Sequence, residues 1–286
     1  MDKNSTNFKI AAFADEAATS LDGQINALLR NNIGLLELRN VDGVSVASLG
    51  YRKALTIANK LRNAGIGVWS IGSPIGKIGI RDSFVPHVEA FRRCLDMAEI
   101  FGAGHIRIFS FYVDPKEKQL DYEGTFARVA ERLAELVYVS SGREIVLCHE
   151  NEKGIFGEKA ADCLGIHRKF PEIKAIFDPA NYLQVGEPTL PAFDLLAEHV
   201  EYMHIKDYDA GSGEVVPPGS GDGHIPELLK RFRGGTVTLE PHLRVFKGLA
   251  KLERAEGKSV VGNAYGSQRA AFAAAAEGLR KCIEQV

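Results

Sequence analysis

The sequence predicts an α/β protein whose single domain, residues 1–286, is a (β/α)8 barrel. Three observations lead to this prediction. Short apolar runs typical of β-strands alternate eight times with longer stretches of helical period. The length of 286 residues suits one barrel of about 250 residues. No G-x-G-x-x-G motif follows the first predicted strand, and this absence argues against a doubly wound dinucleotide-binding sheet.

The predicted strands share a short apolar core bounded by turn or helix signals. They are expected near Phe8–Ala14, Gly34–Arg39, Ile66–Ile71, His105–Phe111, Glu144–His149, Ile173–Asp178, Tyr202–Lys206 and Thr236–Glu240.

Crossover helices are predicted between these strands because apolar residues recur there at helical spacing. Ser48 and Asp121 stand where an N-cap is expected, and an Ala-rich helix over Ser267–Ile283 closes the series. Three glycines follow helical runs where a left-handed residue is favoured: Gly65, Gly102 and Gly142.

The charge balance excludes two classes of partner. The chain has 35 Lys plus Arg and 37 Asp plus Glu, a formal net charge of −2. It therefore has no excess of cations for a nucleic acid or an anionic membrane surface. Residues 1–7 are polar and lack the apolar core of a signal peptide, so we expect a cytoplasmic protein. The four scattered cysteines are expected to be reduced and buried.

Side chains that can bind metal end each of the last four predicted strands. They are Glu150, Asp178, His204 and Glu240. The carboxyl ends of barrel strands meet at one mouth, and three carboxylates and an imidazole buried there would be costly without a cation. One nitrogen and three oxygen ligands favour Mn²⁺, Mg²⁺ or Co²⁺, with zinc as the alternative.

Further charged side chains are predicted inside the barrel by strand alternation. Glu37, Arg39 and Arg107 have two readings, a structural ion-pair network or contact with a substrate. Lys206 is favoured as functional, because three carboxylates and one divalent ion leave a net charge of about −1 that its ammonium could offset.

Two connections are expected to border the mouth. The Gly-rich stretch 210–224 looks too flexible in composition for a packed element, and a disordered surface loop is its alternative reading. The connection 241–265 carries His242, Arg244 and Lys247, which are candidate lid or substrate residues.

The local sequences at the strand ends resemble the sugar phosphate isomerase/epimerase superfamily, the xylose isomerase-like TIM barrels. They read H-E-N around Glu150, F-D-P-A-N around Asp178, H-I-K-D at His204 and L-E-P around Glu240. The segments 217–225 and 13–16 resemble the family's P-x-G-x-G loop and its first strand end. The resemblance covers essentially the whole chain.

The resemblance implies one divalent metal held by Glu150, Asp178, His204 and Glu240. It also implies that Glu150 and Glu240 form the catalytic acid/base pair. Asn181 stands where the family's ketose 3-epimerases usually have histidine, so one substrate contact differs. The predicted substrate-binding residues are Arg39, Arg107, Asn181 and Lys206.

The chemistry expected of such a site is proton transfer next to a carbonyl through a metal-stabilised enediolate. Return of the proton gives an isomerase or epimerase of a sugar or small polyhydroxy carbonyl compound, with a role in carbohydrate metabolism. Loss of a β-hydroxyl gives the alternative, a lyase of the same superfamily: an inosose or 3-dehydroshikimate dehydratase or a 3-keto sugar eliminase.

Two other classes of protein are alternatives to these enzymes. An endonuclease IV-like DNA-repair enzyme would need more histidines at strand ends and a basic face. A non-catalytic sugar-binding module would keep the pocket without proton transfer. The expected partner is a small sugar-like molecule, and the oligomeric state stays open, with a homo-oligomer as one alternative.

Overall fold

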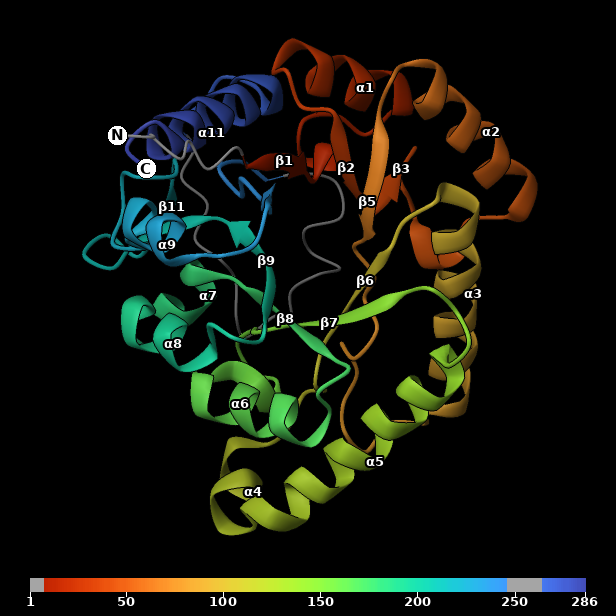
Figure 1. Cartoon of the computed structure of the whole chain (residues 1–286), viewed down its shortest axis with the longest axis vertical. Coiled ribbons are helices and arrows are strands. Elements are labelled where there is room, and N and C mark those ends of the chain that lie inside the picture. The colour runs from red at the N-terminus through yellow and green to blue at the C-terminus, as the bar shows by residue number, and fades with distance from the viewer. Residues whose placement is uncertain (1–7, 246–263) are drawn as a thin grey trace.

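The computed structural model describes residues 8–245 and 264–286, which form a closed barrel of eight parallel strands surrounded by helices (Figure 1). The barrel order is β1-β12-β9-β8-β7-β6-β5-β2. Its strands are β1 (Lys9–Ala12), β2 (Leu35–Leu38), β5 (Gly67–Ile71), β6 (His105–Ile108), β7 (Val146–Glu150), β8 (Lys174–Phe177), β9 (Val200–Ile205) and β12 (Thr236–Leu239). The predicted TIM barrel is confirmed, and each predicted strand is found with small shifts at its ends.

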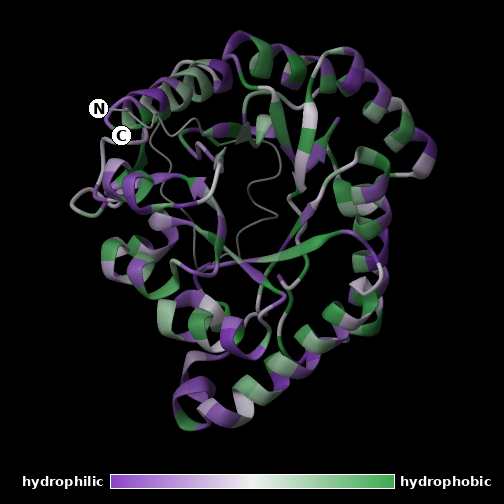
Figure 2. Cartoon of the chain, viewed as in Figure 1, coloured by the Kyte–Doolittle hydropathy of each residue, from purple (hydrophilic) through white to green (hydrophobic). Residues whose placement is uncertain are grey.

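Helices lie outside the barrel and cover its strands (Figure 1). They are α1 (Leu21–Arg30), α2 (Tyr51–Asn63), α3 (Val85–Phe101), α4 (Pro115–Leu120), α5 (Tyr122–Ser140), α6 (Ala160–Lys169), α7 (Pro179–Gln184), α8 (Thr189–Leu196), α9 (Ile225–Arg231) and α11 (Gln268–Ile283). They carry hydrophobic and hydrophilic residues in alternation along the chain (Figure 2), as helices that bury one face do.

Helix ends follow the sequence signals with one exception. The Asp121 side chain accepts a hydrogen bond from the backbone N–H of Gly124, and Ser267 caps α11 in the same way. Gly102 adopts a left-handed conformation after α3. Ser48 is not an N-cap: it ends a 3₁₀ turn, Leu49 is extended, and α2 begins only after Gly50.

Two short antiparallel hairpins extend from the barrel and were not predicted. One pairs β3 (Asn40–Val41) with β4 (Val44–Ser45), and the other pairs β10 (Asp207–Asp209) with β11 (Glu214–Val216). The expectation that 210–224 contains no packed element is therefore wrong. Glycine content suggested flexibility, but backbone pairing and a buried carboxylate fix this segment.

That carboxylate is Asp207, which follows β9 and is fully buried. Its two oxygens accept hydrogen bonds from the backbone N–H groups of Tyr208, Gly219, Gly221 and Gly223, at 2.8–3.0 Å. Glycine is required for this approach, since a Cβ at Gly223 would lie 2.5 Å from Asp207 Oδ1. The loop thus folds around one side chain.

We expect Asp207→Ala to lower the free energy of unfolding by about 2–4 kcal/mol, because it leaves several backbone donors without their charged acceptor. Urea denaturation measures this loss. Asp209→Ala is the matched control, since Asp209 caps the exposed hairpin tip through the N–H of Ser212, and we expect its unfolding transition to stay close to that of wild type. Equal effects of the two substitutions would contradict the assigned role.

Apolar side chains form the main core between the strands and the helices. A second, small cluster comes from residues that lie two positions before the strand ends of the barrel mouth. In that cluster Cys148, Ile176 and Tyr202 pack with Trp69, whose ring stacks on His105 at a centroid distance of 4.1 Å. All four cysteines are buried and free, as predicted.

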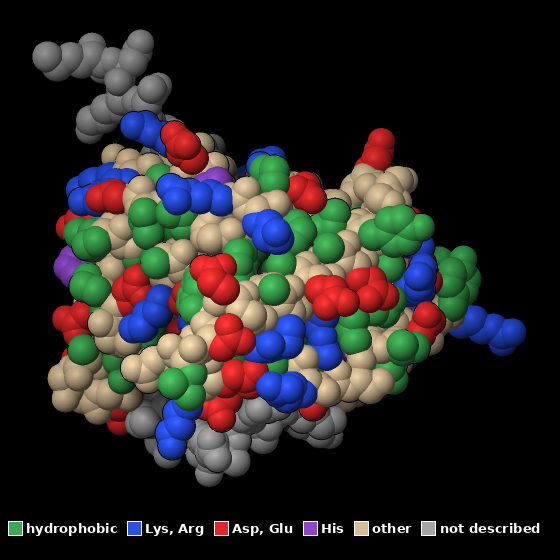
Figure 3. Space-filling model, turned by 90° about the horizontal axis from the view of Figure 1, so that it is seen from below, with side chains coloured by type: hydrophobic (Ala, Val, Ile, Leu, Met, Phe, Trp, Pro, Cys, Tyr) green, Lys and Arg blue, Asp and Glu red, His purple; other side chains and the backbone are tan. Residues whose placement is uncertain are grey.

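The near-zero net charge of the sequence is reflected on the surface. On the face shown in Figure 3, acidic and basic side chains are interspersed. Across the described parts of the chain, we find no helix whose length and apolar character would let it span a membrane.

Candidate metal centre and active site at the barrel mouth

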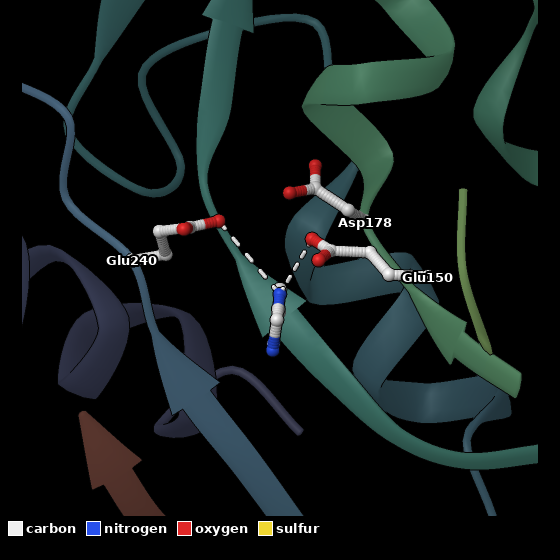
Figure 4. A group of neighbouring side chains, drawn as sticks. Glu150, Asp178 and Glu240 are labelled. Atoms are coloured by element: carbon white, nitrogen blue, oxygen red, sulfur yellow. Dashed lines mark hydrogen bonds and ion pairs between the residues drawn. The ribbon is translucent and has the colours of Figure 1, made fainter. Parts of the chain in front are cut away.

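Four buried side chains converge at the carboxyl ends of neighbouring strands. Glu150 ends β7, Asp178 follows β8, His204 lies near the end of β9, and Glu240 follows β12. Each offers one ligand atom, and these atoms lie within 4.8 Å of one another. Figure 4 shows the Glu150, Asp178 and Glu240 carboxylates pointing into a common space. The sequence thus identified all four members of this cluster.

His204 lies between two of these carboxylates. Its Nδ1 is 2.7 Å from Glu150 Oε1 and 3.7 Å from Glu240 Oε2. Burial would lower the pKa of His204, but the charges of Glu150 and Glu37 and their hydrogen bonds raise it to about 10. The imidazole is therefore protonated at neutral pH when no metal is bound.

Asp178 has a second function as the N-cap of α7. Its Oδ1 accepts a hydrogen bond from the Asn181 N–H at 2.9 Å, and its Oδ2 lies 2.9 Å from Lys206 Nζ. Burial raises the pKa of Asp178 to about 7, with Glu240 and Glu150 adding to the rise and Lys206 opposing it. A carboxylate in this state would be stabilised by a further cation.

The cluster fits a divalent ion by its chemistry. Three carboxylates and one imidazole, at most 3% exposed, surround one position. Such groups are buried in proteins when they are paired or bind metal. Oxygen-rich sets with one histidine suit Mg²⁺, Mn²⁺ or Co²⁺.

Two buried arginines pair with the two glutamates of this cluster. Arg107 Nη1 lies 3.0 Å from Glu150 Oε2, and Arg39 Nη1 lies 2.9 Å from Glu240 Oε1. Both guanidinium groups lie over the Phe13 ring, with Cζ 4.3 Å (Arg39) and 5.0 Å (Arg107) from its centroid. Each glutamate therefore turns one oxygen toward His204 and the other toward an arginine.

Lys206 contacts the Glu240 oxygen that also faces His204. Its Nζ is 3.3 Å from Glu240 Oε2, in addition to the contact with Asp178. Burial would lower the pKa of Lys206, but these two carboxylates raise it above its ordinary value, so the ammonium stays charged. Lys206 thus contributes a charge to the ligand cluster itself.

A second group of ligand-competent side chains consists of Glu16, Glu240 and His242. Arg39 already compensates it: its Nη2 is 3.0 Å from Glu16 Oε1, and it also pairs with Asp15. Burial still raises the pKa of Glu16 to about 8 against the lowering by Arg39. His242 has a left-handed backbone, with φ 46°, and its Nε2 lies 3.4 Å from Glu16 Oε1.

The remaining predicted residues lie at the edge of the site or outside it. The Asn181 side chain donates a hydrogen bond to the Asn151 carbonyl oxygen at 2.8 Å and so links the ends of β7 and β8. Arg244 donates to the Tyr265 carbonyl oxygen and joins the two ends of the connection 241–265. Lys247 lies outside the described residues.

Sequence reasoning missed the contributions of Phe13, Asp15 and Glu16, which follow the first strand. Their signal was the F-A-D-E text at that strand end, which carries two adjacent carboxylates. The structure brings both to Arg39, 23 and 24 residues away in the chain.

Comparison with known proteins finds one matching family and a set of solved structures with the same fold. The model of the xylose isomerase-like TIM barrel family matches residues 39–256. No curated protein matches the chain. The chain is similar to solved structures over nearly its full length, at identities that show the fold alone.

Three of these structures illustrate the range. D-Psicose 3-epimerase from Clostridium cellulolyticum H10 has a TM-score of 0.69 at 16% identity, covering 96% of this chain and 99% of that one. The probable 3-DHS dehydratase AsbF from Bacillus anthracis has a TM-score of 0.67 at 13% identity, covering 95% and 98%. A xylose isomerase-like TIM barrel protein from Mycobacterium smegmatis in complex with magnesium has a TM-score of 0.68 at 14% identity, covering 99% and 98%.

Proposed function

The chain belongs to the xylose isomerase-like TIM barrel family, and from this premise we propose that it is a divalent-metal-dependent isomerase or epimerase. Its substrate is a sugar or a small polyhydroxy carbonyl compound. The observation that carries the proposal is the convergence of Glu150, Asp178, His204 and Glu240 within 4.8 Å at the barrel mouth. We assign these four residues as the ligands of one ion, with Mn²⁺, Mg²⁺ or Co²⁺ favoured and Zn²⁺ as the alternative.

Glu150 and Glu240 are the proposed acid/base pair. They reach the cluster from β7 and from the end of β12, and their carboxylates face each other across the space that Figure 4 shows. One carboxylate would remove a carbon-bound proton, and the other would return a proton to the substrate. A bound divalent ion supplies Lewis-acid chemistry, which lowers the barrier to removal of a proton beside a carbonyl.

The arginine contacts are compatible with this role. A carboxylate oxygen has two lone-pair directions, so an oxygen that accepts a hydrogen bond from Arg107 or Arg39 keeps one for a substrate proton. Burial alone would raise the pKa of Glu240, but the charge of Lys206, the nearby histidines and Arg39 lower it well below its ordinary value, so this glutamate is in its charged, basic form. We assign Arg39, Arg107, Lys206 and Asn181 to substrate binding or to its support around the ligand cluster.

The direct test is product analysis by NMR in D₂O with Mn²⁺, over a panel of sugars, inososes and 3-keto glycosides. The proposal expects an isomer or epimer that carries deuterium at one carbon. A product that lacks one water, or release of the aglycone alcohol from a 3-keto glycoside, identifies a lyase. The dehydratase among the similar structures and the replacement of the epimerase histidine by Asn181 keep a lyase as the second candidate. Metal uptake without any turnover across a broad panel would favour a binding module.

Removal of the Lys206 ammonium is expected to change turnover or KM by tenfold or more, about 1.4 kcal/mol in transition-state terms. Lys206→Met keeps most of the side-chain volume and removes the charge beside Asp178 and Glu240. Steady-state kinetics with the identified substrate measure the effect.

Lys60→Met is the matched control, because Lys60 forms an exposed pair with Asp22 and should affect neither parameter. The structure also predicts a loss of thermal stability for Lys206→Met in the metal-free protein, since two buried carboxylates lose a partner. If the folded variant works at the wild-type rate and KM, Lys206 belongs to a structural network only.

A further inference from the structure

Glu37 is a fully buried carboxylate on β2 that lies beneath His204. Its Oε2 is 3.2 Å from His204 Nε2, and this is the one ion pair of Glu37 among the described residues. A carboxylate is costly to bury unless it is paired, so the pairing of Glu37 with this imidazole calls for a physical reason.

Neighbouring hydroxyl groups fix the other oxygen of Glu37. Tyr202 donates a hydrogen bond to Oε1 at 3.0 Å, and the Ser70 hydroxyl lies 3.5 Å from the same oxygen and 3.1 Å from the Tyr202 hydroxyl. Tyr202 stands two residues before His204 on β9, so both side chains point into the barrel. The carboxylate is therefore held in one orientation, with Oε2 aimed at the imidazole.

The two ring nitrogens of His204 face different groups. Nε2 faces Glu37, whereas Nδ1 faces Glu150 and Glu240 in the proposed ligand cluster. A neutral imidazole carries its proton on one nitrogen and binds metal through the other, and the group that accepts the proton decides which is which. A carboxylate can only accept, so Glu37 favours the proton on Nε2 and leaves Nδ1 open toward the cluster.

We propose that Glu37 is a positioning residue that holds His204 in the Nε2-protonated form with Nδ1 turned to the metal position. This inference rests on the proposed function. Carboxylates that accept a hydrogen bond from the second nitrogen of a metal-bound histidine commonly account for 10- to 100-fold in metal affinity. The Ser70 hydroxyl extends this support to the adjoining strand β5, and the Tyr202 hydroxyl comes from β9, the strand that carries His204.

The test compares Glu37→Gln with wild type in two measurements. Mn²⁺ titration gives the dissociation constant, and we expect it to rise 10- to 100-fold, because the amide of glutamine can donate to Nε2 and so favour the proton on Nδ1. Nitrogen-15 NMR of histidine-labelled protein loaded with Zn²⁺ gives the protonation of His204. In wild type we expect a proton on Nε2 and the metal on Nδ1.

Asp162→Asn is the matched control, since Asp162 is another buried carboxylate, paired with Lys118 at 2.6 Å. It should lower stability while leaving Mn²⁺ affinity unchanged. If Glu37→Gln does not fold, Tyr202→Phe still tests the inference, because it removes the donor that orients Glu37 and should weaken Mn²⁺ binding several-fold.

The outcomes separate this inference from the proposed function. Wild-type affinity and an unchanged His204 spectrum in Glu37→Gln overturn the inference alone, as does wild-type affinity in Tyr202→Phe when Glu37→Gln fails to fold. A wild-type chain that takes up none of Mn²⁺, Mg²⁺, Co²⁺ or Zn²⁺ overturns the proposed function, and the inference with it.

Discussion

Glu150→Gln and Glu240→Gln are each expected to lower turnover by some 10²- to 10⁴-fold, the contribution typical of a positioned general base. Glutamine has nearly the same shape and keeps one oxygen that can bind metal, so each variant should retain part of its metal. The loss arises because an amide cannot take up the carbon-bound proton. The measurements are turnover of the identified substrate and metal content of the same samples.

Deuterium incorporation from D₂O adds a second readout for these variants. If the pair exchanges a carbon-bound proton with solvent, wild type places deuterium at one carbon, and both variants lose this exchange together with turnover. Glu117→Gln is the control, because Glu117 also pairs with an arginine, Arg81 at 2.7 Å, but lies on α4 away from the ligand cluster. Near-wild-type rates in both glutamate variants with metal retained would show that another group moves the proton.

Substitution of His204 or Asp178 by alanine is expected to abolish stoichiometric metal binding, and turnover with it. Each substitution removes one of four ligands that share a single position. Elemental analysis after dialysis against Mn²⁺ measures the loss against one ion per wild-type chain. His167→Ala is the histidine control, because His167 is equally buried but its Nδ1 pairs with the Ile173 carbonyl oxygen behind the strands. Full metal retention by His204→Ala would remove His204 from the ligand set.

Metal affinity should also fall as pH falls, with a slope set by the protons that the ion displaces. The metal-free His204 has a pKa of about 10 and Asp178 one of about 7. Both must lose their protons to bind metal. Between pH 7 and 10 one proton is displaced, so affinity should drop about tenfold for each unit of decreasing pH. Below pH 7 the second proton steepens this dependence. Binding measured from pH 5.5 to 9 checks the sign, and an affinity that rises on acidification would contradict the assignment.

The barrel was predictable because its strands and helices follow different periods along the chain. Strands such as Ile173–Asp178 stood out as apolar runs, and the observed β8 differs from that range by one residue at each end. The β3–β4 and β10–β11 hairpins were missed because strands of two or three residues are too short to show a period. The glycines of 217–223 suggested flexibility, since no local pattern shows that Asp207 binds their N–H groups.

The candidate site was predictable only as far as strand ends locate it. Glu150, Asp178, His204 and Glu240 could be grouped because the carboxyl ends of all barrel strands meet at one mouth. The strand ends do not show which charged side chains form ion pairs with one another. Arg39 meets Glu240 across 201 positions of the chain, and the choice of Glu240 together with Asp15 and Glu16 depends on side-chain rotamers. The position of the His242 side chain depends on a left-handed backbone conformation, and a histidine in the sequence gives no sign of that conformation.

The distribution of the buried charges has a consequence for how the barrel assembles. Arg107 and Glu37 come from the first half of the chain, whereas their partners Glu150 and His204 come from the second. A half-barrel formed alone leaves these charges without their partners, and closing over them unpaired would cost several kcal/mol for each ion. Partly folded intermediates are thereby disfavoured relative to the closed barrel. We therefore expect the two halves to fold as one cooperative unit, with charge complementarity at the mouth selecting the correct closure.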